Sequence, residues 1–462
     1  MRSAVAALRD TVRTQLWPLP VLGVLVAGAA GILLPRLDAR FDARLPGWLD
    51  DLLFGGDAGA ARTLLDAVAS SLITVTSLTF SLTVVTLQLA SSQFSPRLLR
   101  TFTSDQFVQA TLGLFLATFT YSLTVLRAVR SSDEEGKTQF VPRIAVTVSF
   151  VLAVASVLGL VLFLAHLARQ IRVETMLRNV HRDASATARV VLRPRPAGPG
   201  PAVVPRRPEN VPVIPLLAPA SGFLVRVDED GLLEAARDGD VVLVLDRHQG
   251  DAVVSGTPLG RAWSTAGPPS PDACERLQEK VGRALVIGFE RTGTQDIGYG
   301  LRQLTDVASK ALSPGVNDPT TAVHALGHIS ALLCELADHD LGPRLLHDDD
   351  GRVRVAVRQP DLAALLEVAL TQPRRYGASD PMVLRRMYRL LAELAWRAPA
   401  DHHGAIVAHL ERLRRTVVGQ DFDTAEIAEL RGAEREVREA LNRRLPELTP
   451  APTAPGREAG GA

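Results

Sequence analysis

The chain has little cysteine and little lysine, and the shortage of cysteine excludes some kinds of site. Its 462 residues include two cysteines, Cys274 and Cys334, which stand far apart in the sequence. Such a pair supports neither a disulfide framework nor a Cys-x-x-Cys metal site, and it fits a reducing compartment. Lysine occurs three times beside 48 arginines. Because those arginines are scattered, we attribute the shortage of lysine to a compositional bias of the source.

The sequence also lacks a charge imbalance and the short motifs of common enzymes. The formal net charge is +1 at pH 7, so the chain offers no electrostatic reason to bind nucleic acid. No nucleophile elbow, P-loop or dinucleotide fingerprint occurs in a strand–helix setting. His324 and His328 stand four residues apart, but without the glutamate of the zinc-protease pattern. We expect no metal, no cofactor and no enzymatic activity, since no acid–base or nucleophile pair can be assembled.

The sequence does have long apolar runs, and nearly all of them lie in the first 170 residues. Roughly 20 residues, at about 1.5 Å each, cross a bilayer. Four stretches therefore predict membrane-spanning helices, at residues 17–34, 64–90, 107–129 and 144–167, after a short N-terminal segment, 1–16.

The first span is either a cleaved signal peptide or a retained anchor. Arg2, Arg9 and Arg13 precede it, but no convincing small-residue cleavage site follows and further spans do. This pattern favours a retained anchor. Arginine and lysine near the span ends number nine on one side and seven on the other. The excess predicts that both termini lie in the cytoplasm.

The second run is unusual because it is full of hydroxyl groups. Polar side chains in hydrocarbon need partners, so such a helix rarely faces lipid on all sides. The first polar stripe runs from Asp66 to Ser92 at helical spacing. The candidate pathway-lining residues, with Gln93 added at its end, are Ser70, Thr74, Ser77, Ser81, Gln88, Ser92 and Gln93. A second stripe, on another side of the helix at about 100° per residue, consists of Thr76, Thr79, Thr83 and Thr86.

Two interpretations of the first stripe stay open. It lines a water-filled path, with Gln88, Ser92 and Gln93 at the cytoplasmic mouth, or it packs against other helices. Small hydroxyl residues allow close backbone approach and can bond back to the carbonyl four residues earlier. Because two sides of the helix are polar, we expect a central helix that is contacted from more than one direction.

After the last span the long apolar runs end, and the remaining sequence has the composition of a soluble protein. We expect an α-helical membrane protein with a soluble α+β C-terminal domain, in which a small β-rich module precedes a helical domain. Strands are expected near 222–227, 241–245, 259–263 and, alone within the helical domain, 352–358. The expected parts are a Pro-rich linker at 193–219, the β-rich module at 220–265, the helical domain at 271–445 and a disordered tail at 446–462.

One segment of the helical region carries candidate ligand-binding residues, because a helix start can bind an anion. Asp318 suits an N-cap and Pro319 the first helical position, so a purely structural turn explains the same pattern. The pattern returns 62 residues later at Gly377–Pro381, and we expect the two helices to pair. The candidates are Arg291, Gln295, Asp296, Asn317 and Asp318.

Three stretches of the chain resemble a family of predicted bacterial membrane proteins, domain of unknown function 2254. They are Thr86–Phe102, Leu112–Val129 and Gln295–Ala322. The resemblance spans about residues 10–440 and implies a four-span N-terminal region followed by a soluble C-terminal region, with no established activity. We expect the spans to lie in the bacterial inner membrane. Separately, Gly250–Trp263 resembles the last strands of lipoyl-type barrel-sandwich modules. The lysine that those modules modify is absent, so this likeness concerns the fold alone.

Together these observations lead to two hypotheses of function. The first is a homo-oligomeric conduit, channel-like or transporter-like, for ions or small solutes, with a cytoplasmic domain that gates or assembles it. The second is a membrane-tethered scaffold or signalling protein that binds a partner or ligand near Asp318 and Asp380. The lipid bilayer and further copies of the chain are the expected partners, and no soluble partner can be named from the sequence.

Overall fold

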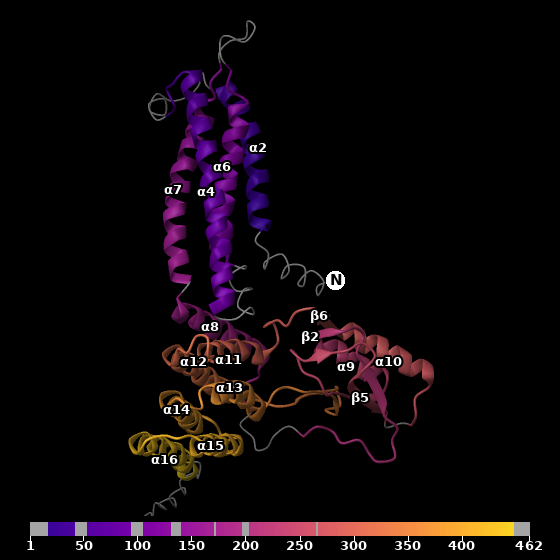
Figure 1. Cartoon of the computed structure of the whole chain (residues 1–462). Coiled ribbons are helices and arrows are strands. Elements are labelled where there is room, and N and C mark those ends of the chain that lie inside the picture. The colour runs from indigo at the N-terminus through magenta and orange to yellow at the C-terminus, as the bar shows by residue number, and fades with distance from the viewer. Residues whose placement is uncertain are drawn as a thin grey trace, which may run out of the picture. The chain divides into compact units, whose positions relative to one another are not determined.

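A computed structural model describes residues 17–41, 53–93, 105–130, 140–170, 172–195, 203–264 and 267–447, without the side chains of 41, 90–93 and 443–447. The chain divides into two compact units, Met1–Thr175 and Met176–Ala462. The expected N-terminal segment 1–16 and nearly all of the tail lie outside the described residues. Figure 1 shows the first unit, in which the described elements are helices, and the second unit, which contains both sheets and helices.

The first unit is a bundle of long apolar helices (Figure 1). Each contains a stretch that is long and apolar enough to cross a membrane. The expected fold class, four such helices followed by a domain of mixed sheets and helices, is therefore confirmed. The helices are α2 (Pro18–Phe41), α4 (Ala58–Gln93), α6 (Gln106–Leu126) and α7 (Arg143–Gln170).

Helix α6, rather than α4, is central in this bundle. It packs against α2, α4 and α7. Small residues bring α2 close: a Cβ added at Gly31 would lie 2.7 Å from Cβ of Thr124 on α6. Close approach through small residues is typical of membrane helix pairs. The expectation that the hydroxyl-rich helix is the central one is wrong for the single chain, because α4 packs with one face only.

Hydroxyl pairs join α6 to α7. The Ser122 and Ser149 oxygens lie 2.7 Å apart, and those of Thr118 and Ser156 lie 3.2 Å apart. All four side chains are buried. Since lipid offers no hydrogen bonds, these polar groups are satisfied only by pairing across the two helices or with their own backbone.

A buried carboxylate joins α2 to the start of α7. Asp38 is 1% exposed and accepts hydrogen bonds from the backbone N–H groups of Ile144 (2.9 Å) and Ala145 (3.3 Å). The first N–H groups of a helix have no partner within that helix, and they carry partial positive charge. Asp38 therefore caps a helix other than its own. The span predicted from the sequence ended at residue 34, so it did not include Asp38.

The sheets of the second unit have a mixed topology. One sheet has the order β1-β5-β3-β8-β7 and the other β4-β2-β6. Only the β3–β8 pair is parallel among the described strands. The strands are β1 (Ile214–Leu217), β2 (Gly222–Val227), β3 (Val241–Leu245), β4 (Ala252–Val253), β5 (Pro258–Ser264), β6 (Leu285–Gly288), β7 (Arg344–His347) and β8 (Val353–Val357).

Helices α9 (Glu229–Asp238) and α10 (Pro271–Ala284) pack against these sheets and contribute to the same core. The expected boundaries differ from this arrangement. Strand β1 lies inside the stretch expected to be a linker, and β6, β7 and β8 join the module from the stretch expected to be helical. The barrel-sandwich likeness likewise left out both helices and the parallel pair. Strands β1 and β6 pair with β5 and β2, which are not their neighbours in the sequence, so local patterns do not predict the pairing.

The rest of the second unit consists of α-helices that pack on one another, and we call this part the helical stack. Helices α12 and α14 pack against each other, as the repeated Asp-Pro pattern suggested. Asp318 caps α12 through the N–H of Thr321, and Asp380 caps α14 through the N–H of Val383, both at 3.0 Å. The helices are α11 (Ile297–Ala311), α12 (Pro319–Ala337), α13 (Leu362–Tyr376), α14 (Pro381–Arg397), α15 (His403–Val418) and α16 (Thr424–Glu447).

Helix α8 (Val173–Val191), which the sequence analysis missed, docks on this stack. Its Ala184 meets α11 so closely that a Cβ at Gly300 would lie 2.4 Å from that of Ala184. Glu335 of α12 accepts hydrogen bonds from Ser185 (2.5 Å) and from Arg189 (3.1 and 3.2 Å). Only residues 171 and 172 separate α8 from the end of α7.

A buried histidine lies between α13 and α15. His409 is 6% exposed, and its Nε2 lies 3.8 Å from a carboxylate oxygen of Glu367, which also pairs with Arg412. Burial, reinforced by the charge of Arg412, lowers the pKa of His409 to about 4, although Glu367 acts in the opposite direction. The imidazole is therefore neutral in the folded protein at neutral pH.

Replacing Asp38 by alanine should destabilise the membrane unit by about 1–2 kcal/mol, because the start of α7 loses its cap. The measurement is the thermal unfolding midpoint of the full chain in detergent. Asp38→Asn is the matched control, since its amide oxygen still accepts the two N–H bonds and should retain much of the stability. If Asp38→Ala were as stable as Asp38→Asn, the cap would have no energetic role.

The low pKa of His409 predicts a pH dependence of stability. Between about 6.5 and 4 the unfolded chain takes up a proton that the folded chain does not. Stability should therefore fall as pH drops through this window, by up to about 3 kcal/mol from this residue.

The His409→Gln variant should flatten that part of the pH profile of the unfolding midpoint. His347→Gln, at an exposed histidine on β7, is the control. Parallel profiles for the parent chain and His409→Gln would contradict the assignment.

Candidate functional site

Helix α4 presents its two polar stripes to different surroundings. Thr76, Thr79, Thr83 and Thr86 are buried in the bundle, where α4 packs on α6 and α7. The hydroxyls of Thr76, Thr83 and Thr86 donate to carbonyls four residues earlier at 2.6–2.8 Å. This second stripe therefore serves helix packing.

The first stripe points out of the bundle. Ser70, Thr74, Ser77, Ser81 and Gln88 are all exposed, while the side chains of Ser92 and Gln93 lie outside the described residues. Ser70 and Thr74 donate to carbonyls of their own helix at 3.3 and 3.2 Å. Large apolar side chains that are also exposed flank the stripe on both sides: Ile73, Leu78, Phe80, Val84 and Val85.

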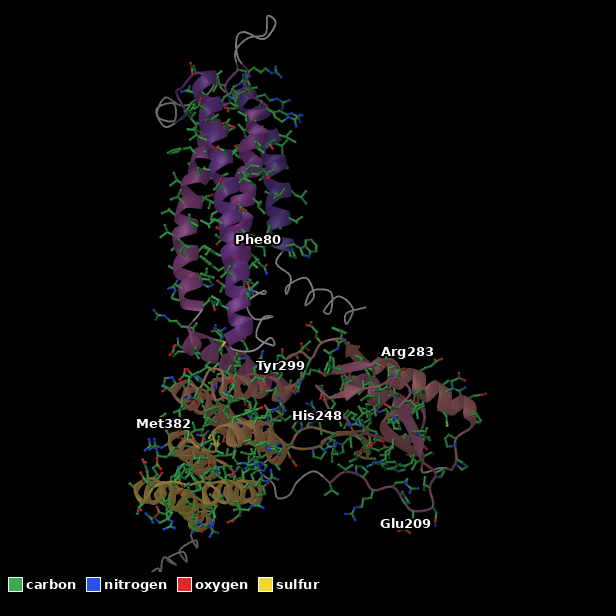
Figure 2. The ribbon with its side chains drawn as sticks, in the orientation of Figure 1. Phe80, Glu209, His248, Arg283, Tyr299 and Met382 are labelled. Atoms are coloured by element: carbon green, nitrogen blue, oxygen red, sulfur yellow. The ribbon has the colours of Figure 1, made fainter. Side chains whose placement is uncertain are left out.

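Phe80 lies on one flank of this stripe, is labelled in Figure 2, and is 57% exposed. A groove of about 600 Å³ also lies between α4 and α7, but its lining is mostly apolar and includes none of the stripe. It is formed by Ala60, Thr63, Leu64, Ala67, Val68, Ser71, Phe150 and Ala153. The polar surface of α4 is thus an outward face of the bundle and not part of this groove.

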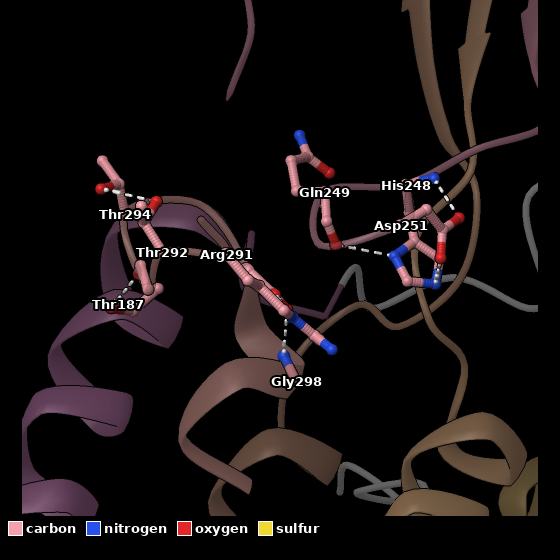
Figure 3. Close-up of polar contacts among 10 residues, drawn as sticks. Thr187, His248, Gln249, Asp251, Arg291, Thr292, Thr294 and Gly298 are labelled. Atoms are coloured by element: carbon pink, nitrogen blue, oxygen red, sulfur yellow. Dashed lines mark hydrogen bonds and ion pairs between the residues drawn. The ribbon is translucent and has the colours of Figure 1, made fainter. Parts of the chain in front are cut away.

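The second candidate region is the loop that joins β6 to α11 (Figure 3). Asp296 is 4% exposed and is the N-cap of α11, where its carboxylate accepts from the Gly298 N–H at 3.0 Å. Arg291 binds both carboxylate oxygens, at 2.5 and 3.1 Å. Burial by itself lowers the pKa of Arg291, but the hydrogen bond and charge of Asp296 outweigh it and raise that pKa above its ordinary value.

A turn of the β module closes over this ion pair. A Cβ added at Gly250 would lie 2.2 Å from Asp296 Oδ2 and 2.6 Å from Arg291 Nε, and its φ of +91° already favours glycine. His248 and Asp251 hold the turn: the His248 N–H donates to the Asp251 carboxylate at 3.0 Å (Figure 3). The loop and the β module are therefore locked together by backbone contact.

Gln295 also has internal partners. Its side-chain oxygen accepts from the Val227 N–H of β2 at 3.0 Å and from the Gln249 amide at 3.5 Å. The cavity beside it measures about 10 Å³, room for about one water molecule. Arg291, Gln295 and Asp296 therefore form a structural junction in this conformation, with no space for an organic ligand in that cavity.

The other two candidates lie at the opposite end of α11. Asn317 has a left-handed φ of +50°, and Asp318 caps α12. The Thr321 hydroxyl and N–H bind the Asp318 carboxylate and hold its pKa below the ordinary value. A 15-residue helix separates these residues from the Arg291 junction, so the five candidates do not form one site.

Possible metal ligands are dispersed. Among the described residues, no three histidine, cysteine or acidic side chains are grouped so that they could hold a metal ion. The ring centres of His181 and His328 lie 5.6 Å apart. Burial, and then the nearby His181, lowers the pKa of His328. These residues belong to the contact between α8 and α12.

Asp296→Ala should lower the free energy of unfolding by on the order of 3 kcal/mol, because Arg291 would keep a partly buried charge without its partner. Urea denaturation of the full chain in detergent measures the loss. Asp246→Ala is the control, since Asp246 pairs with Arg261 on the surface and should cost under about 1 kcal/mol. Equal losses in the two variants would mean that the junction has no special role.

Comparison with known proteins places the chain in a family. Residues 13–393 match the model of DUF2254, described as a predicted membrane protein. The uncharacterized proteins Rv1290c of Mycobacterium tuberculosis H37Rv and Mb1321c of Mycobacterium bovis are each 36% identical to it over 390 residues, 84% of this chain and 73% of theirs. No solved structure matches. The chain therefore belongs to the DUF2254 family of predicted membrane proteins.

Proposed function

We propose that this protein is a homo-oligomeric conduit for ions or small solutes in the bacterial inner membrane, with both termini in the cytoplasm. The observation that carries the proposal is the outward stripe of α4. Five hydroxyl and amide side chains between Ser70 and Gln88 are exposed at helical spacing on a helix that is apolar enough to span a membrane.

Lipid provides no partners for this stripe, and the single bundle provides backbone carbonyls for only part of it. A hydroxyl in hydrocarbon is satisfied by its own backbone or by another helix, and backbone bonds account for Ser70 and Thr74. The terminal amide of Gln88 is at the end of a longer side chain and is not satisfied by a hydrogen bond to the backbone of its own helix in the way that a hydroxyl is. Several copies that turn their α4 stripes toward a shared axis would place these groups against water and one another.

The apolar flanks suit the same arrangement. Phe80 and Val84 lie on one side of the stripe and Leu78 and Val85 on the other, at about 100° per residue. In a ring of copies these side chains would pack against the neighbouring α4 helices and seal the path from lipid. The buried threonine stripe would hold each α4 on its own bundle.

The soluble unit would then assemble or gate the conduit. Its helix α8 begins within three residues of the end of α7 and is fixed to α11 and α12 by Ala184, Ser185 and Arg189. A rearrangement of the stack would therefore be transmitted through a short covalent connection to a membrane helix.

The test is cysteine accessibility combined with flux. Both native cysteines lie outside the membrane unit; Cys274 is replaced by serine, and burial raises the pKa of Cys334 to about 11, which leaves its thiol un-ionised at neutral pH. In liposomes, the protein should conduct potassium. Ser77→Cys and Ser81→Cys should react with a membrane-impermeant thiol reagent and lose most of that flux.

Val85→Cys, on the apolar flank, is the matched control and should react slowly with no loss of flux. Absence of flux for potassium and for small organic anions, together with unreactive Ser77→Cys and Ser81→Cys, would overturn the conduit. Oxidative cross-linking of Ser81→Cys between copies without flux would instead support the alternative, an oligomeric membrane-tethered scaffold.

A further inference from the structure

Arginine side chains gather where the C-terminal end of α13 meets α15. Arg374 and Arg375 end α13, and Arg412 and Arg415 lie on the facing part of α15. The Arg374 guanidinium donates to the Thr416 hydroxyl at 2.7 Å, which ties the two helices together. We call Arg374, Arg375, Arg412 and Arg415 the arginine cluster.

The cluster has too few acidic partners. Glu367 pairs with Arg412. Within the part of the chain that the structure describes, no carboxylate forms an ion pair with Arg374, Arg375 or Arg415. By comparison, the partly buried Arg354 of the same unit pairs with both Asp240 and Asp348. Three neighbouring cations therefore share a surface without counter-charge.

Arg374 makes this arrangement costly. Its side chain is only half-exposed, and burial, followed by the charges of Arg375 and Arg412, lowers its pKa below the ordinary value. Its one hydrogen bond among described residues uses one of the five N–H donors of a guanidinium. Buried charges are normally paired, because an unpaired charge loses hydration without compensation.

The geometry points to an anion as the missing partner. We propose that the arginine cluster binds a phosphate group, carried by a soluble phosphorylated compound or by an anionic lipid headgroup. Guanidinium forks match the oxygens of phosphate in bidentate fashion, and arginine is favoured over lysine for this purpose. The partly buried Arg374 would be the central donor, and the exposed Arg375 and Arg415 would bind the remaining oxygens of the phosphate.

Glu367 and His409 shape the site without binding the ligand. Glu367 pairs with Arg412 and thereby connects α13 to α15, and within α13 it accepts a hydrogen bond from Thr371 at 2.6 Å. His409 is uncharged at neutral pH for the reason given above and adds no repulsion to the cluster. The proposal does not depend on the conduit, since the residues belong to the soluble unit alone.

The test measures binding to the full chain in neutral detergent with two probes. Inorganic pyrophosphate represents a soluble phosphate, and phosphatidylglycerol added to the micelles represents a lipid headgroup. Titration calorimetry and native mass spectrometry should detect at least one of them. The double variant Arg375→Ala/Arg415→Ala should weaken that binding at least tenfold, and Arg374→Lys should weaken it while keeping the charge.

The charge-matched control is Arg283→Ala/Arg385→Ala. Arg283 (Figure 2) pairs with Glu279, and Arg385 pairs with Glu429, so this variant should bind like the parent chain. Loss of pyrophosphate binding in the cluster variant assigns a soluble ligand, and loss of lipid binding alone assigns a headgroup. Binding of neither probe by the parent chain, or equal weakening in both double variants, would overturn the proposal.

Discussion

The membrane unit depends on one constraint: every polar group within hydrocarbon has to find a partner in the protein. Three of the four buried threonines of α4, Thr76, Thr83 and Thr86, donate to carbonyls of their own helix, and the serines of α6 and α7 bond across the helix interface. Asp38 finds its partners at the start of a neighbouring helix. Each of these solutions also fixes a helix against another one, so the polar groups decide how the bundle packs. The outward stripe of α4 is satisfied only in part within the bundle, where Ser70 and Thr74 bond to their own backbone, and we propose that it faces other copies of the chain.

The soluble unit follows the corresponding rule for charges. The Arg291–Asp296 pair is buried under Gly250, and Glu335 receives both Ser185 and Arg189 where α8 docks. These pairs occur where segments distant in the sequence meet, at the junction of the β module with α11 and of α8 with α12. In the arginine cluster, only Arg412 forms an ion pair among the described residues, and for this reason we propose a phosphate ligand there.

Local patterns predicted much of the fold. Apolar length revealed the four spans, and the strands β2, β3 and β8 lie where alternation and turn residues predicted them. Asp318 and Asp380 are helix caps, as the Asp-Pro pattern indicated. The missed elements include α8, β1, β6 and β7. Strands β1 and β6 pair with strands that are not their neighbours in the sequence, whereas β7 is a four-residue edge strand beside β8. Asp38 was missed because the cap that it provides belongs to a helix more than a hundred residues later.

The sequence by itself determined which residues are polar within the apolar runs and where helices begin, because helical periodicity and capping act over a few neighbouring residues. Only the tertiary structure decided which polar stripe of α4 is buried, since periodicity cannot tell a partner in the same bundle from a partner outside it. It also separated Arg291 from Asp318, placing them at opposite ends of α11, and brought Arg374 beside Arg415. Those outcomes depend on packing between distant segments, for which no single stretch of sequence carries the information.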